Sequence, residues 1–174
     1  LTFDWNTNDK IATIGIKQTQ KSDNKNEELL FKIPFTLVFY YKNSEERFSI
    51  EIKSNKEKFC FRLKNKPLFF RIDPDYECPC KIVVTDVPRP MFHEQIKRDP
   101  DPIGRIEAAM ALSKNSSSED VSILGERLKK EKEWGVSIRI SKALGKVGGK
   151  EARNFLLKGL KISDSKIRRG VVSA

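Results

Sequence analysis

Residues 31–41 read FKIPFTLVFYY, and this stretch decides the fold of the first half of the chain. Its apolar side chains recur at every second position, at Phe31, Ile33, Phe35, Leu37 and Phe39. Side chains two residues apart share one face of a β-strand, so the stretch predicts a strand with this face buried. Pro34 has no backbone N–H, which favours an edge position or a bulge at that point of the strand.

Similar short stretches surround it on both sides. Alternating apolar residues recur at 14–16, 48–52, 59–63, 68–72 and, more weakly, 82–84. The polar link 42–45 is short enough for a hairpin. Because no helical pattern separates these stretches, they predict at least six strands in an antiparallel β-sandwich over residues 1–86, not a βαβ sheet.

The apolar period changes in the second half of the chain. Prolines at 88, 90, 100 and 102 mark the change, and beyond them apolar residues follow the period of a helix. Four apolar stripes predict four helices: Ile103, Ile106 and Met110; Val121, Leu124 and Leu128; Val136, Ile140, Leu144 and Val147; and Ala152, Phe155, Leu156 and Leu160. Asp101 before Pro102 is a good start for the first helix, and Gly148 with Gly149 a good stop after the third.

These helices repeat along the sequence. Ala111 and Leu112 correspond to Ala143 and Leu144 at an offset of 32 residues, and Leu128 corresponds to Leu160 at the same offset. Paired helices with a period in the thirties are typical of an α-solenoid. The predicted fold class is therefore β + α in two domains, with the sandwich followed by HEAT-like helical repeats over 87–174 as a truncated array.

The composition of the chain bears on its solubility and its location in the cell. In 174 residues no apolar run approaches the roughly 20 that a membrane-spanning helix needs, so we expect a soluble protein with no membrane partner. The chain begins at Leu1 without a targeting signal, which suggests an internal fragment. Three cysteines are too few for a disulfide framework, and we expect a cytoplasmic protein.

The basic charge is concentrated in the second half. Residues 1–86 carry 15 basic and 13 acidic side chains, whereas residues 87–174 carry 19 and 11. A basic ridge along the solenoid is expected from five side chains: Arg105, Arg139, Lys142, Arg168 and Arg169. Few aromatic residues accompany these cations, so a solvated face is favoured over binding of nucleic acid.

Histidine and cysteine offer weak signals for a metal. His93 and Glu94 begin like the zinc motif H-E-x-x-H, but Lys97 stands where the second histidine is needed. We therefore expect His93 to be a solvated residue in the first turn of a helix. Cys78 and Cys80 are too closely spaced for a structural zinc site, unless Cys60 joins them, so free thiols in a loop, with Cys60 structural, are favoured.

A glycine-rich segment and an aromatic residue in the second half also bear on function. Residues 145–150 read GKVGGK but lack the first glycine and the Ser or Thr of a phosphate-binding loop, so they are interpreted as a turn between helices. Trp134 begins a helix with Val136 and Ile140 beyond it, which predicts that its ring packs against the preceding unit. We accordingly expect no catalytic, cofactor-binding or metal-ligating residue in this chain.

The order of segments resembles a known family. The segments IGIKQTQ at 14–20, LFKIPF at 30–35 and KPLFFRIDP at 66–74 resemble the β-domain of aminopeptidase N-like zinc aminopeptidases. The segments RDPDPIGRIEAA at 98–109, WGV at 134–136 and KALGKVGG at 142–149 are similar to HEAT-type repeats in prokaryotic members. The resemblance covers nearly the whole chain.

This resemblance implies a non-catalytic C-terminal region of a zinc-dependent metallopeptidase. The family's zinc and its hydrolase chemistry lie in a preceding catalytic domain, whose motifs are absent from this sequence. The region would brace that domain, its expected partner, and wall the cavity through which peptide substrates enter. A related subunit of a general transcription factor has the same architecture without peptidase activity, so an inactive scaffold is the alternative, and an independent HEAT-repeat interaction protein is a third.

Overall fold

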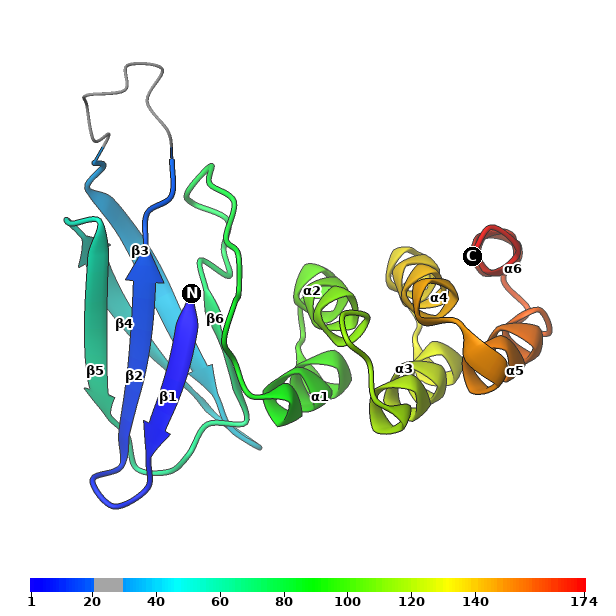
Figure 1. The fold of residues 1–174 in the computed structure, drawn as a ribbon, viewed down its shortest axis with the longest axis horizontal. Coiled ribbons are helices and arrows are strands. Elements are labelled where there is room, and N and C mark those ends of the chain that lie inside the picture. The colour runs from blue at the N-terminus through cyan, green and yellow to red at the C-terminus, as the bar shows by residue number, and fades with distance from the viewer. Residues whose placement is uncertain (21–29) are drawn as a thin grey trace. The chain divides into compact units, whose positions relative to one another are not determined.

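The computed structural model describes residues 1–20 and 30–174, which divide into the compact units Leu1–Pro88 and Arg89–Ala174. Within the described residues, six strands lie in the first unit and six helices in the second (Figure 1). All strand pairs within the two sheets are antiparallel. The predicted fold class, antiparallel β-structure followed by paired helices, is confirmed.

The first unit is built from two three-stranded sheets. One contains β1 (Thr2–Asn6), β2 (Ile11–Lys17) and β5 (Lys56–Arg62) in the order β1-β2-β5, and the other contains β3 (Ile33–Tyr40), β4 (Glu45–Ile52) and β6 (Phe69–Ile72) in the order β4-β3-β6. Aromatic rings join the sheets: Phe39 of β3 lies 5.3 Å from Phe61 of β5 between centroids, and Phe3 of β1 stacks on Phe70 of β6. The two sheets therefore share one core.

The strand predicted from residues 31–41 is shorter than its apolar pattern. β3 begins at Ile33, and the Phe31 side chain is 53% exposed, so Phe31 is not part of the buried face. Pro34 pairs opposite Glu51 of β4, whereas β6 reaches only from Leu37 to Tyr40. On its β6 side, Pro34 therefore has no ladder hydrogen bond to lose.

The strand predicted at 82–84 is wrong. Ile82, Val83 and Val84 are exposed, and the segment runs beside the N-terminus, where the Leu1 amine donates to the Val83 carbonyl at 2.9 Å. The sixth strand is instead β1, where only Phe3 is buried. A strand with a single buried apolar residue carries too little alternation to be recognised from sequence.

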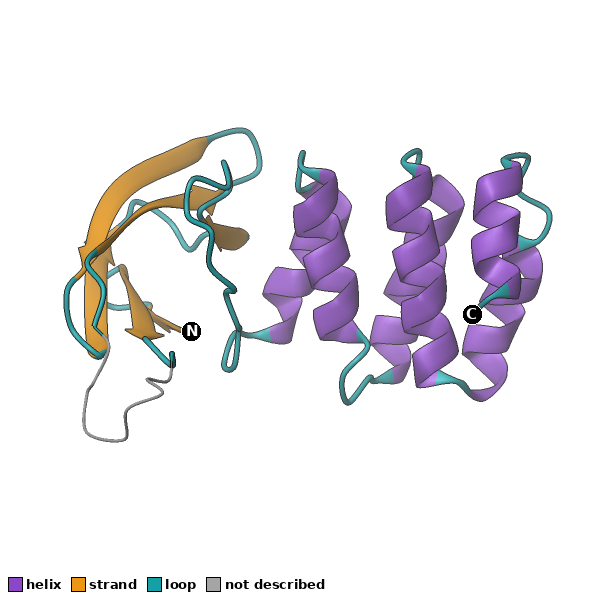
Figure 2. Ribbon diagram, turned by 90° about the horizontal axis from the view of Figure 1, so that it is seen from above, coloured by secondary structure: helices purple, strands orange, loops and turns teal. Residues whose placement is uncertain are grey.

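The second unit contains α1 (Arg89–Arg98), α2 (Pro102–Leu112), α3 (Ser118–Lys130), α4 (Trp134–Val147), α5 (Gly149–Gly159) and α6 (Ser165–Val172). Figure 1 shows α2, α4 and α6 in one layer and α1, α3 and α5 in the other. In Figure 2 the helices stand side by side, and short loops connect consecutive helices, which belong to opposite layers. The apolar stripes had not predicted α1.

Helix ends follow the expected capping chemistry. The Asp101 side chain accepts a hydrogen bond from the Ile103 N–H at the start of α2, with Pro102 in the first turn. Gly148 ends α4 with a φ of 69°, in the region that glycine adopts at little cost. These local signals account for the predicted start of α2 and end of α4.

The helical core differs from the predicted stripe in α2. Ile103 and Met110 are 45% and 52% exposed, whereas Ala108, Ala109 and Leu112 are fully buried. Small side chains on the buried face allow neighbouring helix backbones to approach closely, and Leu112 supplies the apolar volume. Of the apolar stripe predicted for α2, only Ile106 packs against the core, and Ile103 and Met110 do not.

Candidate functional site

Asp120, in the first turn of α3, is a fully buried carboxylate with three side-chain partners. Arg89 Nη2 donates to Asp120 Oδ2 at 2.8 Å, and the Ser117 hydroxyl donates to the same oxygen at 2.7 Å. His93 Nε2 of α1 lies 2.7 Å from Asp120 Oδ1. Burial alone would raise the pKa of Asp120, but hydrogen bonds from Arg89, His93 and Ser117 outweigh burial and hold the pKa well below its ordinary value.

This arrangement corrects the prediction for His93. The side chain is not solvated: His93 is only 8% exposed, and its imidazole joins α1 to α3 through Asp120. Because Asp120 is ionised, the His93 Nε2–H must donate the hydrogen bond. The imidazole is therefore used for packing two helices together.

Glu131, directly after α3, is the centre of a second buried ion cluster. Arg105 Nε of α2 donates to Glu131 Oε2 at 2.9 Å, and Arg127 Nη2 donates to the same oxygen at 2.6 Å. Burial would raise the pKa of Glu131, but hydrogen bonds from Arg105, the Glu133 backbone and Arg127 lower it overall. This cluster joins α2 to the end of α3.

Arg105 is thereby removed from the predicted basic ridge. It is 7% exposed and also donates to the Asp99 and Pro100 carbonyls. Arg168 likewise donates to the Ile162 carbonyl at 2.8 Å. Of the five predicted ridge residues, the other three remain exposed: Arg139, Lys142 and Arg169.

The three cysteines are free thiols. Cys60 is exposed, with its sulfur 3.7 Å from Thr13 Oγ1, so it is not a core residue. Desolvation and the hydrogen bond with Cys78 raise the pKa of the Cys80 thiol to about 11, which disfavours the thiolate that metals bind. Within residues 1–20 and 30–174, no group of three or more His, Cys, Asp or Glu could hold a metal ion.

The surface of α4–α6 is strongly basic. Residues 134–174 contain ten Lys or Arg and only two Asp or Glu. In the described part of the chain, no ion pair engages any of these ten cations. Lys158 and Lys166 lie over aromatic rings, and Arg168 donates to a backbone carbonyl. The other seven are Arg139, Lys142, Lys146, Lys150, Arg153, Lys161 and Arg169. This part of the solenoid therefore presents cationic groups that are free to meet anionic ones.

Trp134 lies on this surface, contrary to the prediction. Its side chain is 48% exposed, and its ring contacts α6, where Lys166 Nζ lies 4.9 Å from the ring centroid. The ring is therefore not buried against the preceding unit. Val136 and Ile140, the apolar residues used for the prediction, do lie in the core.

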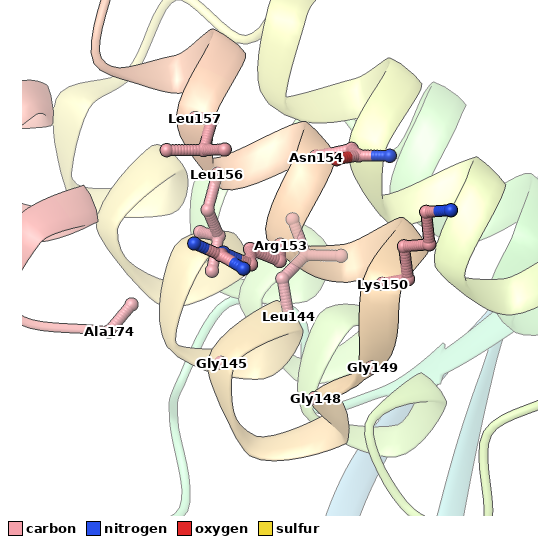
Figure 3. Close-up of a pocket in the computed structure, with 10 residues that line it drawn as sticks. All are labelled: Leu144, Gly145, Gly148, Gly149, Lys150, Arg153, Asn154, Leu156, Leu157 and Ala174. Carbon is pink, nitrogen blue, oxygen red and sulfur yellow. The ribbon is translucent and has the colours of Figure 1, made fainter.

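A cavity of about 720 Å³ opens between the end of α4, the start of α5 and Ala174. Figure 3 shows its lining residues, with Gly148 and Gly149 at the turn between the two helices. Leu144, Leu156 and Leu157 contribute apolar surface, while Lys150 and Arg153 contribute positive charge. A cavity lined by both leucine side chains and cationic groups suits an amphipathic, anionic ligand.

Only part of this cavity could be anticipated from the sequence. The interpretation of residues 145–150 as a turn between helices is only partly right, because residues 145–147 end α4, residues 149–150 begin α5 and Gly148 alone lies between them. Four of these residues line the cavity: Gly145, Gly148, Gly149 and Lys150. Arg153, Asn154 and Leu157 were missed. The 32-residue offset could have indicated them, because it relates Arg153, Asn154 and Leu157 to Val121, Ser122 and Gly125 of α3.

Comparisons with known proteins agree with this architecture. Residues 89–174 match the family model described as HEAT repeats. The whole chain is similar in fold to the crystal structure of Legionella pneumophila aminopeptidase A in complex with aspartic acid, with a TM-score of 0.56 and 12% identity over 98% of this chain and 25% of that chain. No curated protein matches the chain.

These comparisons define the class of structure. The helical unit is HEAT-like, and the fold of the chain, a β-unit followed by helices, is similar to part of an aminopeptidase. The chain spans about a quarter of the length of that aminopeptidase. In the part of the chain that the structure describes, no helix is both long and apolar enough to cross a membrane.

Proposed function

We propose that this chain is the non-catalytic C-terminal region of a zinc-dependent aminopeptidase. Its β-unit would brace the peptidase domain, and its HEAT-like unit would form one wall of the cavity that admits peptides. The observation that carries the proposal is the fold match, which covers 98% of this chain with a quarter of an aminopeptidase. Both units of the chain fall within that match.

The chemistry of this chain supports an accessory role. The buried carboxylates of the two ion clusters, Asp120 and Glu131, are occupied by arginine and histidine partners within the fold. The zinc and the hydrolytic groups would therefore belong to a preceding domain of the parent protein. The partners would be that domain and, indirectly, peptide substrates, and the free thiols support a reducing, cytoplasmic setting.

The test compares the parent protein with this chain. Mass spectrometry of the protein from its source identifies the parent, which is then purified and assayed with an aminoacyl anilide, with and without a chelator. We expect zinc-dependent turnover by the parent and none by residues 1–174 alone. Chelator-sensitive turnover that copurifies with the isolated chain would contradict the accessory role.

A scaffold without peptidase activity is the second candidate. It is favoured by the HEAT match of residues 89–174 and by the unpaired cations and open cavity of α4 and α5, which are features of an interaction surface. A parent that lacks the zinc motif and shows no turnover in the same assay would select this scaffold function.

A further inference from the structure

The loop that follows β6 brings two cysteines together in one tight turn. Residues 73–80 read DPDYECPC, with Cys78 and Cys80 on either side of Pro79. The Cys80 N–H donates to the Cys78 carbonyl at 2.8 Å, which closes a three-residue turn around the proline. Two steps of the chain span at most about 7 Å, and the turn shortens that span. The two Cα atoms are therefore within the separation of about 4.4–6.8 Å that a disulfide bridges.

Buried groups of the β-unit hold this loop in place. Asp73, directly after β6, is buried, and its two carboxylate oxygens accept the Glu77 N–H at 2.8 Å and the Cys78 N–H at 3.0 Å. Arg71 of β6 is also buried, and its Nη2 donates to the Tyr76 hydroxyl at 2.8 Å. The backbone is thus fixed up to the first of the two cysteines, and the proline turn positions the second.

The two sulfur atoms have different roles. Desolvation and the hydrogen bond with Cys78 raise the pKa of the Cys80 thiol to about 11, so Cys80 keeps its proton near neutral pH. Thiol–disulfide exchange begins with attack by a thiolate, so Cys78 is the sulfur available for the first attack. Cys78 is partly exposed, which allows a small molecule to reach it. Cys80, hydrogen-bonded to Cys78, is in position to attack second.

We propose that Cys78 and Cys80 form a redox-active dithiol that exchanges with a small-molecule disulfide of the glutathione type. The Cys78 thiolate attacks one sulfur of that disulfide, forms a mixed disulfide and releases one thiolate. Cys80 then loses its proton, attacks the Cys78 sulfur, forms the bond within the loop and releases the second thiolate. The protons of both cysteines end on the two released thiols. The dithiol loses two electrons, and the small disulfide gains them.

The second step is helped by the first, and the product stays reversible. The negative charge of Cys78 contributes to the raised pKa of Cys80, and that charge disappears when Cys78 enters the mixed disulfide. Closing so short a loop removes little freedom from the unfolded chain, so the bond adds little stability. Disulfides strained by a small ring are also reduced readily. The free thiols are then the state of the loop under reducing conditions.

Other uses of these thiols are disfavoured. A soft metal ion binds thiolates, but Cys80 keeps its proton, and in the part of the chain that the structure describes no group of three or more His, Cys, Asp or Glu could hold a metal. Cys60 lies in the other sheet, on β5, where its sulfur is 3.7 Å from Thr13 Oγ1. The site is built from residues 71–80, away from both ends of the chain, and it does not depend on the proposed aminopeptidase origin.

Peptide mapping tests the proposal directly. Trypsin, which cleaves after Lys and Arg, releases both loop cysteines in peptide 72–81 and Cys60 in peptide 59–62. The reduced chain is equilibrated with mixtures of reduced and oxidised glutathione, quenched with acid, alkylated and digested. We expect peptide 72–81 to lose two hydrogen atoms and to escape alkylation, and dithiothreitol to restore both thiols. An unoxidised peptide, addition of two glutathione molecules, linkage to Cys60 or linkage between two chains would each overturn the proposal.

The free peptide 72–81 is the matched control for the contribution of the fold. It contains the same cysteines and proline but lacks the strand that anchors the loop. Because the folded loop holds the thiols together, the chain should close its disulfide at about a tenfold lower concentration of oxidised glutathione than the peptide, at a fixed concentration of reduced glutathione. Equal concentrations would mean that the fold does not prepare the pair and would overturn the proposal.

Single substitutions separate the roles of the two sulfur atoms. Cys80→Ser leaves Cys78 able to attack, so the reaction should stop at one glutathione on the loop. Cys78→Ser should slow the reaction of the loop about tenfold or more, because Cys80 is desolvated and keeps its proton. Cys60→Ser is the control and should leave the product unchanged and the rate within about twofold. Equal rates for Cys78→Ser and Cys80→Ser would refute the order of attack.

Discussion

The two halves of the helical unit use their charges in opposite ways. Residues 89–133, which include α1–α3, contain nine basic and nine acidic side chains, and several of the cations are ion-paired there. Residues 134–174 contain ten basic and two acidic side chains, and most of the cations are unpaired within the described residues. The first half uses charge to join helices, and the second presents charge at its surface.

The buried ion clusters of the first half and the exposed cations of the second half should contribute to different properties of the protein. Buried ion clusters cost much to break, because removing one partner leaves the other charged and poorly solvated. Exposed cations contribute little to folding but can be recognised by an anionic partner. Substitutions in the first half should therefore affect stability, and those in the second half should affect binding.

The largest effect is expected from Glu131→Ala. It leaves Arg105 buried without a carboxylate and should lower the free energy of unfolding of the helical unit by about 3–5 kcal/mol. Urea unfolding followed by far-UV circular dichroism measures the change. The control is Glu133→Ala, two residues away and exposed, which should change stability by less than about 0.5 kcal/mol. Equal effects of both variants would remove the contrast between the two halves.

Acid should lower the free energy of unfolding of the helical unit by less than Glu131→Ala does, because a protonated carboxyl can still accept hydrogen bonds. The pKa values of Asp120 and Glu131 are lower in the folded state than in the unfolded chain. The folded unit therefore binds fewer protons, and its stability is present above about pH 4 and declines as the pH falls below that value. Unfolding curves over this range measure the decline, which Asp120→Asn should make shallower. A stability that is flat down to pH 2 would refute the role of both carboxylates.

A pair of glycine substitutions compares the covered face of α3 with an open position in α4. Gly125→Ala places a Cβ against the Phe155 ring and should cost about 1–3 kcal/mol. Gly135→Ala meets no atom within 4 Å and should stabilise α4 by up to about 1 kcal/mol through helix propensity. Thermal unfolding of both variants provides the comparison. Stabilisation by Gly125→Ala would mean that α5 does not pack closely on α3.

The smallest effect is expected from Trp134→Ala in the basic half. The ring is 48% exposed and contacts Lys166, an arrangement worth about 0.5–1 kcal/mol at exposed sites. Urea unfolding should therefore detect a loss of no more than about 1 kcal/mol, and Lys166→Met should remove a similar amount. If the loss reached the 3 kcal/mol or so that is typical of a buried aromatic, the ring would belong to the core.

The order and type of the elements could be predicted from the sequence because the period of apolar residues is local information. The change from a period of two to one near 3.6 separates strands from helices, and the 32-residue offset indicates paired helices. The same reasoning missed β1 and α1. β1 has a single buried residue, Phe3, whose ring stacks on Phe70 of β6, and α1 is joined to α3 by the contact of His93 with Asp120. Neither contact can be seen in the local pattern of apolar residues.

The sequence by itself therefore determined the fold class and the basic character of α4–α6, while the tertiary structure decided which charges remain available. His93 and Arg105 looked solvated because their partners, Asp120 and Glu131, lie 27 and 26 residues away. Trp134 looked buried because Val136 and Ile140 of the same helix are apolar. Its ring lies instead on the exposed side of α4, beside Lys166 of α6. Such pairings form only when the helices stack, because the partners lie on, or directly after, different helices and are far apart in the sequence.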